Sequence, residues 1–304
     1  MGFVKANRER AFLKAIVQGP PGSGKSWTAL ELASWLVSGS YRGPDNAGRV
    51  AVIDSEGRAR EYAGGTPFWF SLEEPESFGP DKWIAALQEA RRLGFGVVIL
   101  DSLSDEWRGR GGVLEQADQA KGEGVNSFRA WGPLKAAHWR LVEEILAFPG
   151  HVLITLRSKL EYSLEEVPGQ RGKQVVCRGL APITEDELPY RFPFIFELST
   201  EGEAEAAGPV LRVRKSVAAS LPVGSLWPRP GRDLAKKIEE WIGTPGSVVP
   251  SVFLSWRAKI AEASTKADLD VAAIGLRKAA AELTEREVAR LREVFAARKA
   301  EFKE

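Results

Sequence analysis

Eight residues near the start of the sequence have the types and spacing of a phosphate-binding loop. GPPGSGKS at 19–26 fits the pattern G-x-x-x-x-G-K-[ST] in full. Glycines let consecutive backbone N–H groups point at phosphate oxygens, and the N-terminus of a following helix adds its positive dipole end. Lys25 would reach the terminal phosphates, and the Ser26 hydroxyl would ligate magnesium. The predicted contacts to ATP and Mg²⁺ are Gly19, Pro20, Pro21, Gly22, Ser23, Gly24, Lys25, Ser26 and Trp27.

Two acidic residues complete a predicted hydrolytic site. Asp101 ends the apolar run GVVIL, where a P-loop ATPase needs a carboxylate for the magnesium shell, although a strand-end aspartate also starts ordinary turns. Glu56 lies in VIDSEG, just after another apolar run, and would orient and polarise the attacking water. Many AAA+ ATPases carry that glutamate directly after the strand-end aspartate, but Ser102 occupies that position here. We therefore assign the role to Glu56, with Asp105 and Glu106 next, against the alternative of a solvated loop glutamate.

Apolar runs that alternate with helical patterns would position these residues. The pattern predicts strands at 13–17, 50–53, 96–100 and 152–156, and helices at 26–37, 80–93 and 134–148. Such alternation needs crossover connections, which implies a mainly parallel sheet covered by helices on both faces. From Tyr162 to Cys177 the chain reads as polar and irregular. Two later runs, 194–198 and 210–213, look like strands that extend the sheet as an antiparallel edge, and 233–241 looks like a short helix.

The C-terminal part differs from this α/β pattern. Residues 243–250, GTPGSVVP, are rich in glycine and proline and read as a linker. Beyond it the periodicity is helical, and Thr265 with Asp268 and Thr284 with Glu287 have the spacing of capping boxes. We expect an ATPase core at 1–243, a linker at 244–250 and a small helical domain at 251–304.

Composition limits the classes of function. Hydrophobic residues make up 44% and charged residues 27%, the balance of a globular protein. No apolar run approaches the roughly 20 residues that span a bilayer, and the N-terminus lacks a signal peptide, so we expect a cytoplasmic protein with no membrane partner. A single cysteine, Cys177, excludes an internal disulfide framework. The formal net charge of +1 means that any DNA contact must come from local basic patches.

The order GPPGSGKS, VIDSEG, VVILDS and LITLRSK resembles the RecA-like recombinase core. It is most similar to the minimal RecA-like ATPases, encoded by phages, that assist single-strand annealing and recombination. The resemblance covers roughly residues 12–243. It implies that Glu56 is the catalytic base, that single-stranded DNA is a partner, and that the chain assembles as a ring or filament in a bacterial or phage-infected cell. Thr155 stands where that family has a phosphate-sensing glutamine.

A basic segment after the core strands has a second implied role. LRVRKS at 211–216 resembles the family's segment that inserts into the ATP site of a neighbouring subunit. Lys215 is the best match and Arg214 the second, so the resemblance implies that Lys215 is catalytic in trans. The plainer interpretation is an edge strand protected by charged residues.

Two segments mix cations with aromatic residues, as single-strand binding requires. Both are expected to leave the carboxyl edge of the sheet, and ordinary solvated loops are the plainer interpretation. The first, 104–131, carries Trp107, Arg108, Arg110, Lys121, Arg129 and Trp131. The second, 157–178, carries Tyr162 and the predicted DNA contacts Arg157, Lys159, Arg171, Lys173 and Arg178.

Together these features favour an ATP-dependent protein that binds single-stranded DNA in recombination or annealing. The main alternative is an AAA+-type protein remodeller or helicase loader, and DNA-independent ATPase activity would favour it. A small-molecule kinase would need a lid with clustered arginines, which the sequence lacks, and a nucleotide-gated scaffold would bind ATP without turnover. The C-terminal helices would dock a single-strand-binding or other recombination protein.

Overall fold

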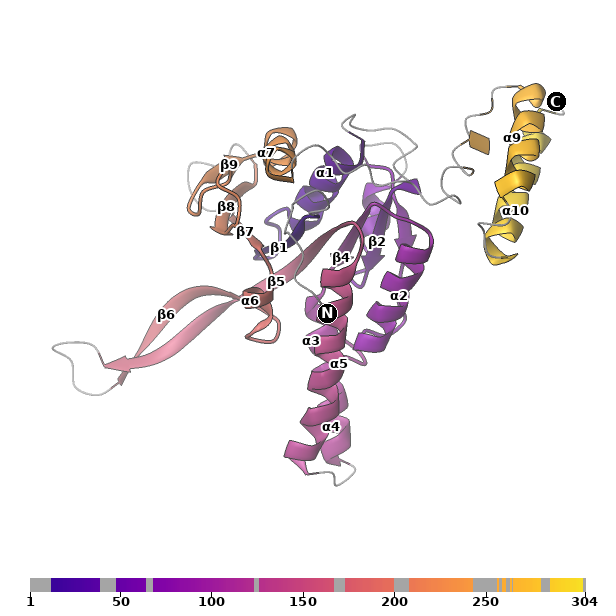
Figure 1. The fold of residues 1–304 in the computed structure, drawn as a ribbon. Helices are drawn as coiled ribbons and strands as arrows, with labels where there is room; N and C mark the ends of the chain where they lie inside the picture. The colour runs from indigo at the N-terminus through magenta and orange to yellow at the C-terminus, as the bar shows by residue number, and fades with distance from the viewer. Residues whose placement is uncertain are drawn as a thin grey trace, which may run out of the picture.

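The apolar runs of the core form one sheet in this computed structural model, which describes residues 12–38, 48–63, 68–122, 126–166, 173–199, 208–242, 256, 259–260, 263, 265–279 and 285–302. The parallel strands are β1 (Lys14–Gly19), β2 (Val50–Asp54), β3 (Ser71–Glu73), β4 (Val97–Asp101), β5 (His151–Glu166) and β7 (Phe194–Ser199). Their order is β3-β2-β4-β5-β1-β7, continued by β8 (Val210–Lys215) and β9 (Leu226–Pro228) (Figure 1). All of the core strand runs predicted from the sequence are therefore present.

Helices cover both faces of the sheet. Alternate residues of a strand point to opposite faces, so neighbouring residues of one strand pack against different helices. Ala15 and Val17 pack with α1 (Lys25–Ser38) and α7 (Arg232–Ile242) on one face. Ile16, between them, packs on the other face with α2 (Pro80–Arg92), α5 (Ser127–Ala147) and the short α6 (Leu188–Arg191). This architecture is the predicted α/β P-loop NTPase core. Among the described helices, none is long and apolar enough to cross a bilayer.

A long β-hairpin occupies the stretch that we expected to be irregular. β5 continues past the sheet to Glu166 and pairs antiparallel with β6 (Lys173–Pro182), so the two strands project as an arm (Figure 1). The irregular assignment was wrong for the described residues, 162–166 and 173–177. The arm leaves the body of the protein, and its side chains Leu160, Tyr162 and Val175 are all exposed. Leu160, Tyr162 and Leu164 recur at every second position of β5, which is the alternation of a strand, so the sequence held a signal that the irregular assignment missed.

Helices also replace the first predicted loop segment. The described part of this segment holds α3 (Ser104–Arg108), α4 (Val113–Gly122) and the start of α5, and a glycine-rich turn in which Gly111 has a φ of +72° separates α3 from α4. Helix α5 begins at Ser127, before the expected start at residue 134, and contains Pro133. The expected start thus lay one residue after Pro133, although proline is normally disfavoured in a helix interior.

The sheet edge and the C-terminal helices complete the fold. β7 is parallel to β1, whereas β8 and β9 are antiparallel, so only part of the predicted antiparallel edge is correct. Helices α9 (Lys266–Ala279) and α10 (Glu285–Glu301) share a small apolar cluster with Leu93 of the core. The capping box at Thr265 is confirmed, since its N–H donates to Asp268 Oδ2 at 2.8 Å and its hydroxyl oxygen accepts from the Asp268 N–H at 3.2 Å. Thr284 and the predicted linker at 244–250 lie outside the described residues.

Candidate active site

The phosphate-binding loop connects β1 to α1, as its sequence pattern requires. Gly22 and Gly24 have φ values of +76° and +85°, a backbone region that other residues rarely adopt. A Cβ at Gly19 would lie 2.7 Å from the carbonyl oxygen of Leu198, so the loop packs tightly at its base. Lys25 Nζ donates a hydrogen bond to the Pro20 carbonyl at 2.9 Å, within the loop itself. The loop thus forms a glycine-lined cradle around a cation, which fits a triphosphate.

Aromatic side chains lie beside this loop. Trp27, the second residue after Lys25, is 40% exposed and meets the ring of Phe68 edge-on at 4.9 Å between ring centroids. The ring of Tyr62, at the end of the 3-10 turn η2 (Ala59–Tyr62), lies 6.2 Å from Trp27. Tyr62 and Phe68 were not predicted as site residues, since only the tertiary structure brings them to the start of α1.

Asp101 lies next to the loop and is almost fully buried at the end of β4. Its carboxylate accepts hydrogen bonds from the hydroxyl groups of Ser26 and Thr155. Burial raises the pKa of Asp101, while both hydroxyl groups and Lys25 act in the opposite direction. Ser26 and Asp101 therefore form a pair of oxygen ligands that suits Mg²⁺ with water and phosphate oxygens in its other positions.

The carboxylate of Asp54 stabilises the loop that carries Glu56. Asp54 Oδ1 accepts from the N–H groups of Glu56 and Gly57 at 2.8 and 3.0 Å, and its Oδ2 accepts from the N–H of Ala59 at 2.7 Å. These bonds fix the backbone that carries Glu56. Sequence reasoning missed the role of Asp54, although an aspartate that bonds the backbone two residues on is a known turn-forming pattern.

Burial and neighbouring charges shift the pKa of Glu56. Glu56 as a residue is exposed, yet the protein around its carboxyl group removes enough water to raise its pKa. Asp101 raises that pKa further, while the nearby cations Arg157 and Lys25 lower it. Burial also lowers the pKa of Lys25, and the charges of Glu56 and Asp101 oppose that change. Lys25, Glu56 and Asp101 thus share one electrostatic environment.

A hydrogen-bonded network connects the Glu56 loop to β5. The Ser55 hydroxyl donates to Asp105 Oδ2 at 2.8 Å, and it accepts from the Ser102 N–H at 3.0 Å. The other oxygen of Asp105 accepts from the guanidinium of Arg157. Thr155, the residue at the phosphate-sensing position, is fully buried and bonded to Asp101. Asp105, the next candidate base in the sequence analysis, is therefore engaged in positioning contacts, a role that was not predicted.

Glu106, the other alternative base, is buried elsewhere. Both of its carboxylate oxygens lie 3.0 Å from His138 Nδ1, and both side chains are 1% exposed. The rings of Trp107 and Trp139 pack edge-on against the imidazole. This pair links α3 to α5 and leaves Glu106 without access to solvent.

Lys215 lies away from the phosphate loop of its own chain. Its Nζ donates to the carbonyl oxygens of Pro189 and Tyr190 at 3.2 and 2.9 Å. Through β7 it is level with Ile16, three residues before the end of β1 at Gly19. Arg214, the second choice, forms an ion pair with Glu197.

The predicted DNA contacts are spread along the arm. Arg157 lies at the base of the arm beside Asp105, and Lys159 is exposed on β5. Arg171 lies outside the described residues. Lys173 and Arg178 belong to β6, but their side chains lie outside the described part of the structure. In the first segment, Lys121 pairs with Asp118, and the rings of Trp107 and Trp131 are 6.1 Å apart.

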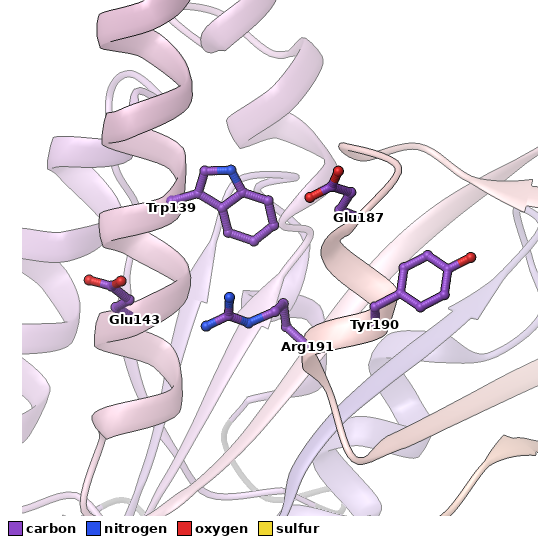
Figure 2. Close-up of a pocket in the computed structure, with 5 residues that line it drawn as sticks. All are labelled: Trp139, Glu143, Glu187, Tyr190 and Arg191. Atoms are coloured by element: carbon purple, nitrogen blue, oxygen red, sulfur yellow. The ribbon is translucent and has the colours of Figure 1, made fainter.

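A separate hollow of about 590 Å³ lies between α5 and α6 (Figure 2). The Arg191 guanidinium lies over the ring of Trp139, 5.6 Å from its centroid. None of the residues that line the hollow is a predicted site residue, although Lys215 Nζ donates to the carbonyl of one of them, Tyr190. The lining residues are Trp139, Glu143, Glu187, Tyr190 and Arg191.

Comparisons with known proteins relate the chain to one family and to one solved structure. A KaiC-like protein from the hyperthermophilic archaeon Pyrococcus horikoshii OT3 is structurally similar with a TM-score of 0.38 and 11% identity, over 70% of this chain and 83% of that chain. No curated protein matches the sequence. The family model described as "AAA domain" matches residues 11–176, which include the phosphate loop, Glu56 and Asp101. Because this match spans more than half of the 304 residues, the chain belongs to the AAA-domain family of P-loop ATPases.

Proposed function

We propose that this protein hydrolyses ATP with magnesium and couples hydrolysis to the binding of single-stranded DNA in recombination or annealing. The observation that carries the proposal is the meeting of Lys25, Asp101 and Glu56 around one glycine-lined loop. ATP, when bound, supplies the phosphoanhydride bond that is broken. The basic groups of the chain then bind the phosphates, and its acidic groups hold magnesium or accept a proton.

Each site residue has one role in this proposal. Lys25 offsets the charge of the terminal phosphates, and its pKa is lowered because burial removes water from the ammonium group. Ser26 and Asp101 hold magnesium. Glu56 accepts a proton from the attacking water, and its raised pKa makes it a better proton acceptor than an ordinary glutamate.

The arm supports the DNA part of the proposal. It begins at the strand next to the phosphate loop and carries exposed Lys159 and Tyr162, the latter 58% exposed. Cations beside aromatic rings suit a single strand, since the cations track phosphates and the rings stack on bases. The nucleotide site and the proposed DNA surface are thus continuous through β5.

The rate of ATP hydrolysis with and without single-stranded DNA tests the proposal. DNA should stimulate turnover in the wild-type protein, and Lys25→Ala should abolish it. A Lys159→Ala, Tyr162→Ala double variant should keep basal turnover but weaken DNA binding, and its affinity should fall less steeply with salt. The absence of DNA binding with any nucleotide present would reject the recombination function, while leaving the ATPase intact.

We further propose that Lys215 completes the ATP site of a neighbouring copy in a ring or filament. Lys215→Ala and Glu56→Gln should each be inactive. A mixture of the two should regain activity, because some interfaces then combine an intact Glu56 with an intact Lys215. Co-assembly is confirmed separately by size-exclusion chromatography of tagged copies. A co-assembled mixture as inactive as its components would reject the trans role.

A protein remodeller or helicase loader is the second candidate, favoured by the AAA-domain family match. In that case turnover should be independent of DNA and should rise with a protein partner. The C-terminal helices α9 and α10 are the proposed docking module in either case. Deleting residues 251–304 should then abolish partner binding without changing basal ATP hydrolysis.

A further inference from the structure

Arg157 occupies a distinctive position at the junction between the nucleotide site and the arm. On the sheet it pairs in register with Gly19, the first residue of the phosphate loop. Its N–H donates to the Ser104 hydroxyl at 3.0 Å, and its carbonyl accepts from the Ile183 N–H at 2.7 Å. The first residue pair of the arm, Ser158 with Pro182, follows directly. The backbone of Arg157 is therefore fixed at the base of the arm.

The guanidinium of Arg157 is only partly paired. One of its terminal nitrogens donates to Asp105, while its Nε is buried with no hydrogen-bond partner among the described residues. A buried donor without an acceptor is costly, so such a group usually has a partner in another state of the protein. Asp105 is also shared, because its second oxygen accepts from Ser55, next to Glu56.

The missing partner of Arg157 is expected on the nucleotide side. Its charge lowers the pKa of both Lys25 and Glu56, so the guanidinium lies close to the groups that face the terminal phosphate. Three donors would then converge on that phosphate: the loop N–H groups, Lys25 and Arg157. The planar guanidinium suits a phosphate, since two of its N–H groups can bond two phosphate oxygens at once.

We propose that Arg157 binds the terminal phosphate of ATP within its own subunit, and that the phosphate competes with Asp105 for the guanidinium. This inference rests on nucleotide binding at the phosphate loop and does not depend on DNA binding. It assigns Arg157 to the nucleotide rather than to DNA. It also makes the base of the arm sensitive to whether ATP or ADP is bound, because Arg157 adjoins the first residue pair of the arm.

Equilibrium binding of a slowly hydrolysed ATP analogue and of ADP, each with magnesium, tests this assignment. Arg157→Ala should weaken binding of the analogue by about 10- to 100-fold, as expected for a lost charge-assisted bond, and ADP binding by less than about threefold. Arg157→Lys should keep most of the preference for the analogue. Arg140→Ala, which removes an exposed arginine on α5, is the matched control and should change neither affinity.

A second substitution separates phosphate binding from a structural ion pair. Asp105→Asn removes the competing carboxylate charge and should strengthen analogue binding relative to ADP, even if Arg157→Ala fails to fold. An ion pair that only holds the fold would be weakened alike by changes at Arg157 and Asp105, with no change in the preference between nucleotides.

Two further outcomes would overturn the inference in distinguishable ways. Equal weakening of both nucleotides by Arg157→Ala, or loss of DNA affinity alone, would reject the phosphate role and leave the ATPase proposal standing. A wild-type protein that binds neither nucleotide would reject the phosphate-loop assignment as well.

Discussion

Buried ionisable groups lie at both ends of the central strands, but the two sets differ in their hydrogen-bond partners. At the amino end, burial lowers the pKa of His151 to about 4, and the charge of Lys14 adds to the effect. Burial also lowers the pKa of Lys14 to about 7, with Arg91 contributing. At the carboxyl end, burial raises the pKa of Glu56 and Asp101. Perturbed ionisation by itself therefore does not separate a structural cluster from a functional one.

The hydrogen-bond partners make the distinction. Lys14 Nζ donates to the carbonyls of Phe148 and Gly150 at 2.7 and 2.8 Å, and His151 Nδ1 accepts from the Leu13 N–H at 3.0 Å. The amino-end groups thus pair with backbone that folding itself supplies. At the other end, and among the described residues, Lys25 Nζ bonds only its own loop and the Glu56 carboxyl has no hydrogen bond. Groups left available after folding are the ones that can act on a ligand.

Glu56→Gln should have the largest effect on activity. An amide cannot accept the proton of the attacking water, so we expect phosphate release to fall by about 10²- to 10⁴-fold while ATP binding is retained. Steady-state phosphate release and equilibrium ATP binding measure the two parts. Turnover close to that of the wild type would move the base to another residue, and Asp105→Asn would then be examined, since Glu106 is committed to His138.

Acid should destabilise the amino-end cluster through His151. The unfolded state binds the proton with a pKa near 6.5 and the folded state with a pKa of about 4, so stability falls as the pH drops through this window. The full loss below pH 4 amounts to about 3 kcal/mol. Urea unfolding at several pH values measures it. His151→Asn, which keeps an acceptor for the Leu13 N–H, should lose less stability on acidification, and an identical pH dependence would contradict this assignment.

Thr155→Val should have a smaller effect, confined to the carboxyl end. The valine removes one hydroxyl donor to Asp101, which raises the pKa of that carboxyl further and weakens it as a ligand. We expect about tenfold more magnesium to be needed for half-maximal turnover, the effect of one hydrogen bond to a charged group. Magnesium titration of the ATPase rate measures this. A loss of maximal rate with unchanged magnesium dependence would assign Thr155 to phosphate sensing instead.

Lys14→Met should change turnover least. It leaves the carbonyls of Phe148 and Gly150 without their donor, so stability should fall by about 1–3 kcal/mol for each unpaired group. Turnover of the folded protein should stay within about twofold of the wild type, because Lys14 lies at the opposite end of β1 from the phosphate loop. A large loss of turnover in the folded variant would show that the two ends are coupled and would break the comparison.

Local sequence patterns determined most of the core. The phosphate loop is specified by contiguous residues whose glycines and lysine act together, and the buried strands are continuous apolar runs. Both features can be predicted from the sequence because they depend on neighbouring residues alone. The phosphate loop needs the backbone freedom of Gly22 and Gly24, and the strands need apolar side chains that are excluded from water. The same holds for Asp101, which the end of an apolar run places at the carboxyl edge of the sheet.

Only the tertiary structure decided how the remaining site residues are used. Arg157 looked like one of several cations on a DNA-binding loop, but β5 lies beside β1, which brings it level with Gly19. Asp105 meets Ser55 and Arg157 across about fifty residues of sequence. The arm forms because β5 and β6 pair with each other, and the alternation of Leu160, Tyr162 and Leu164 with polar residues is the sequence signal that could have predicted its first strand. Contacts between residues far apart in the sequence, such as those of Arg157 and Asp105, leave no periodic pattern, so only the folded structure shows them.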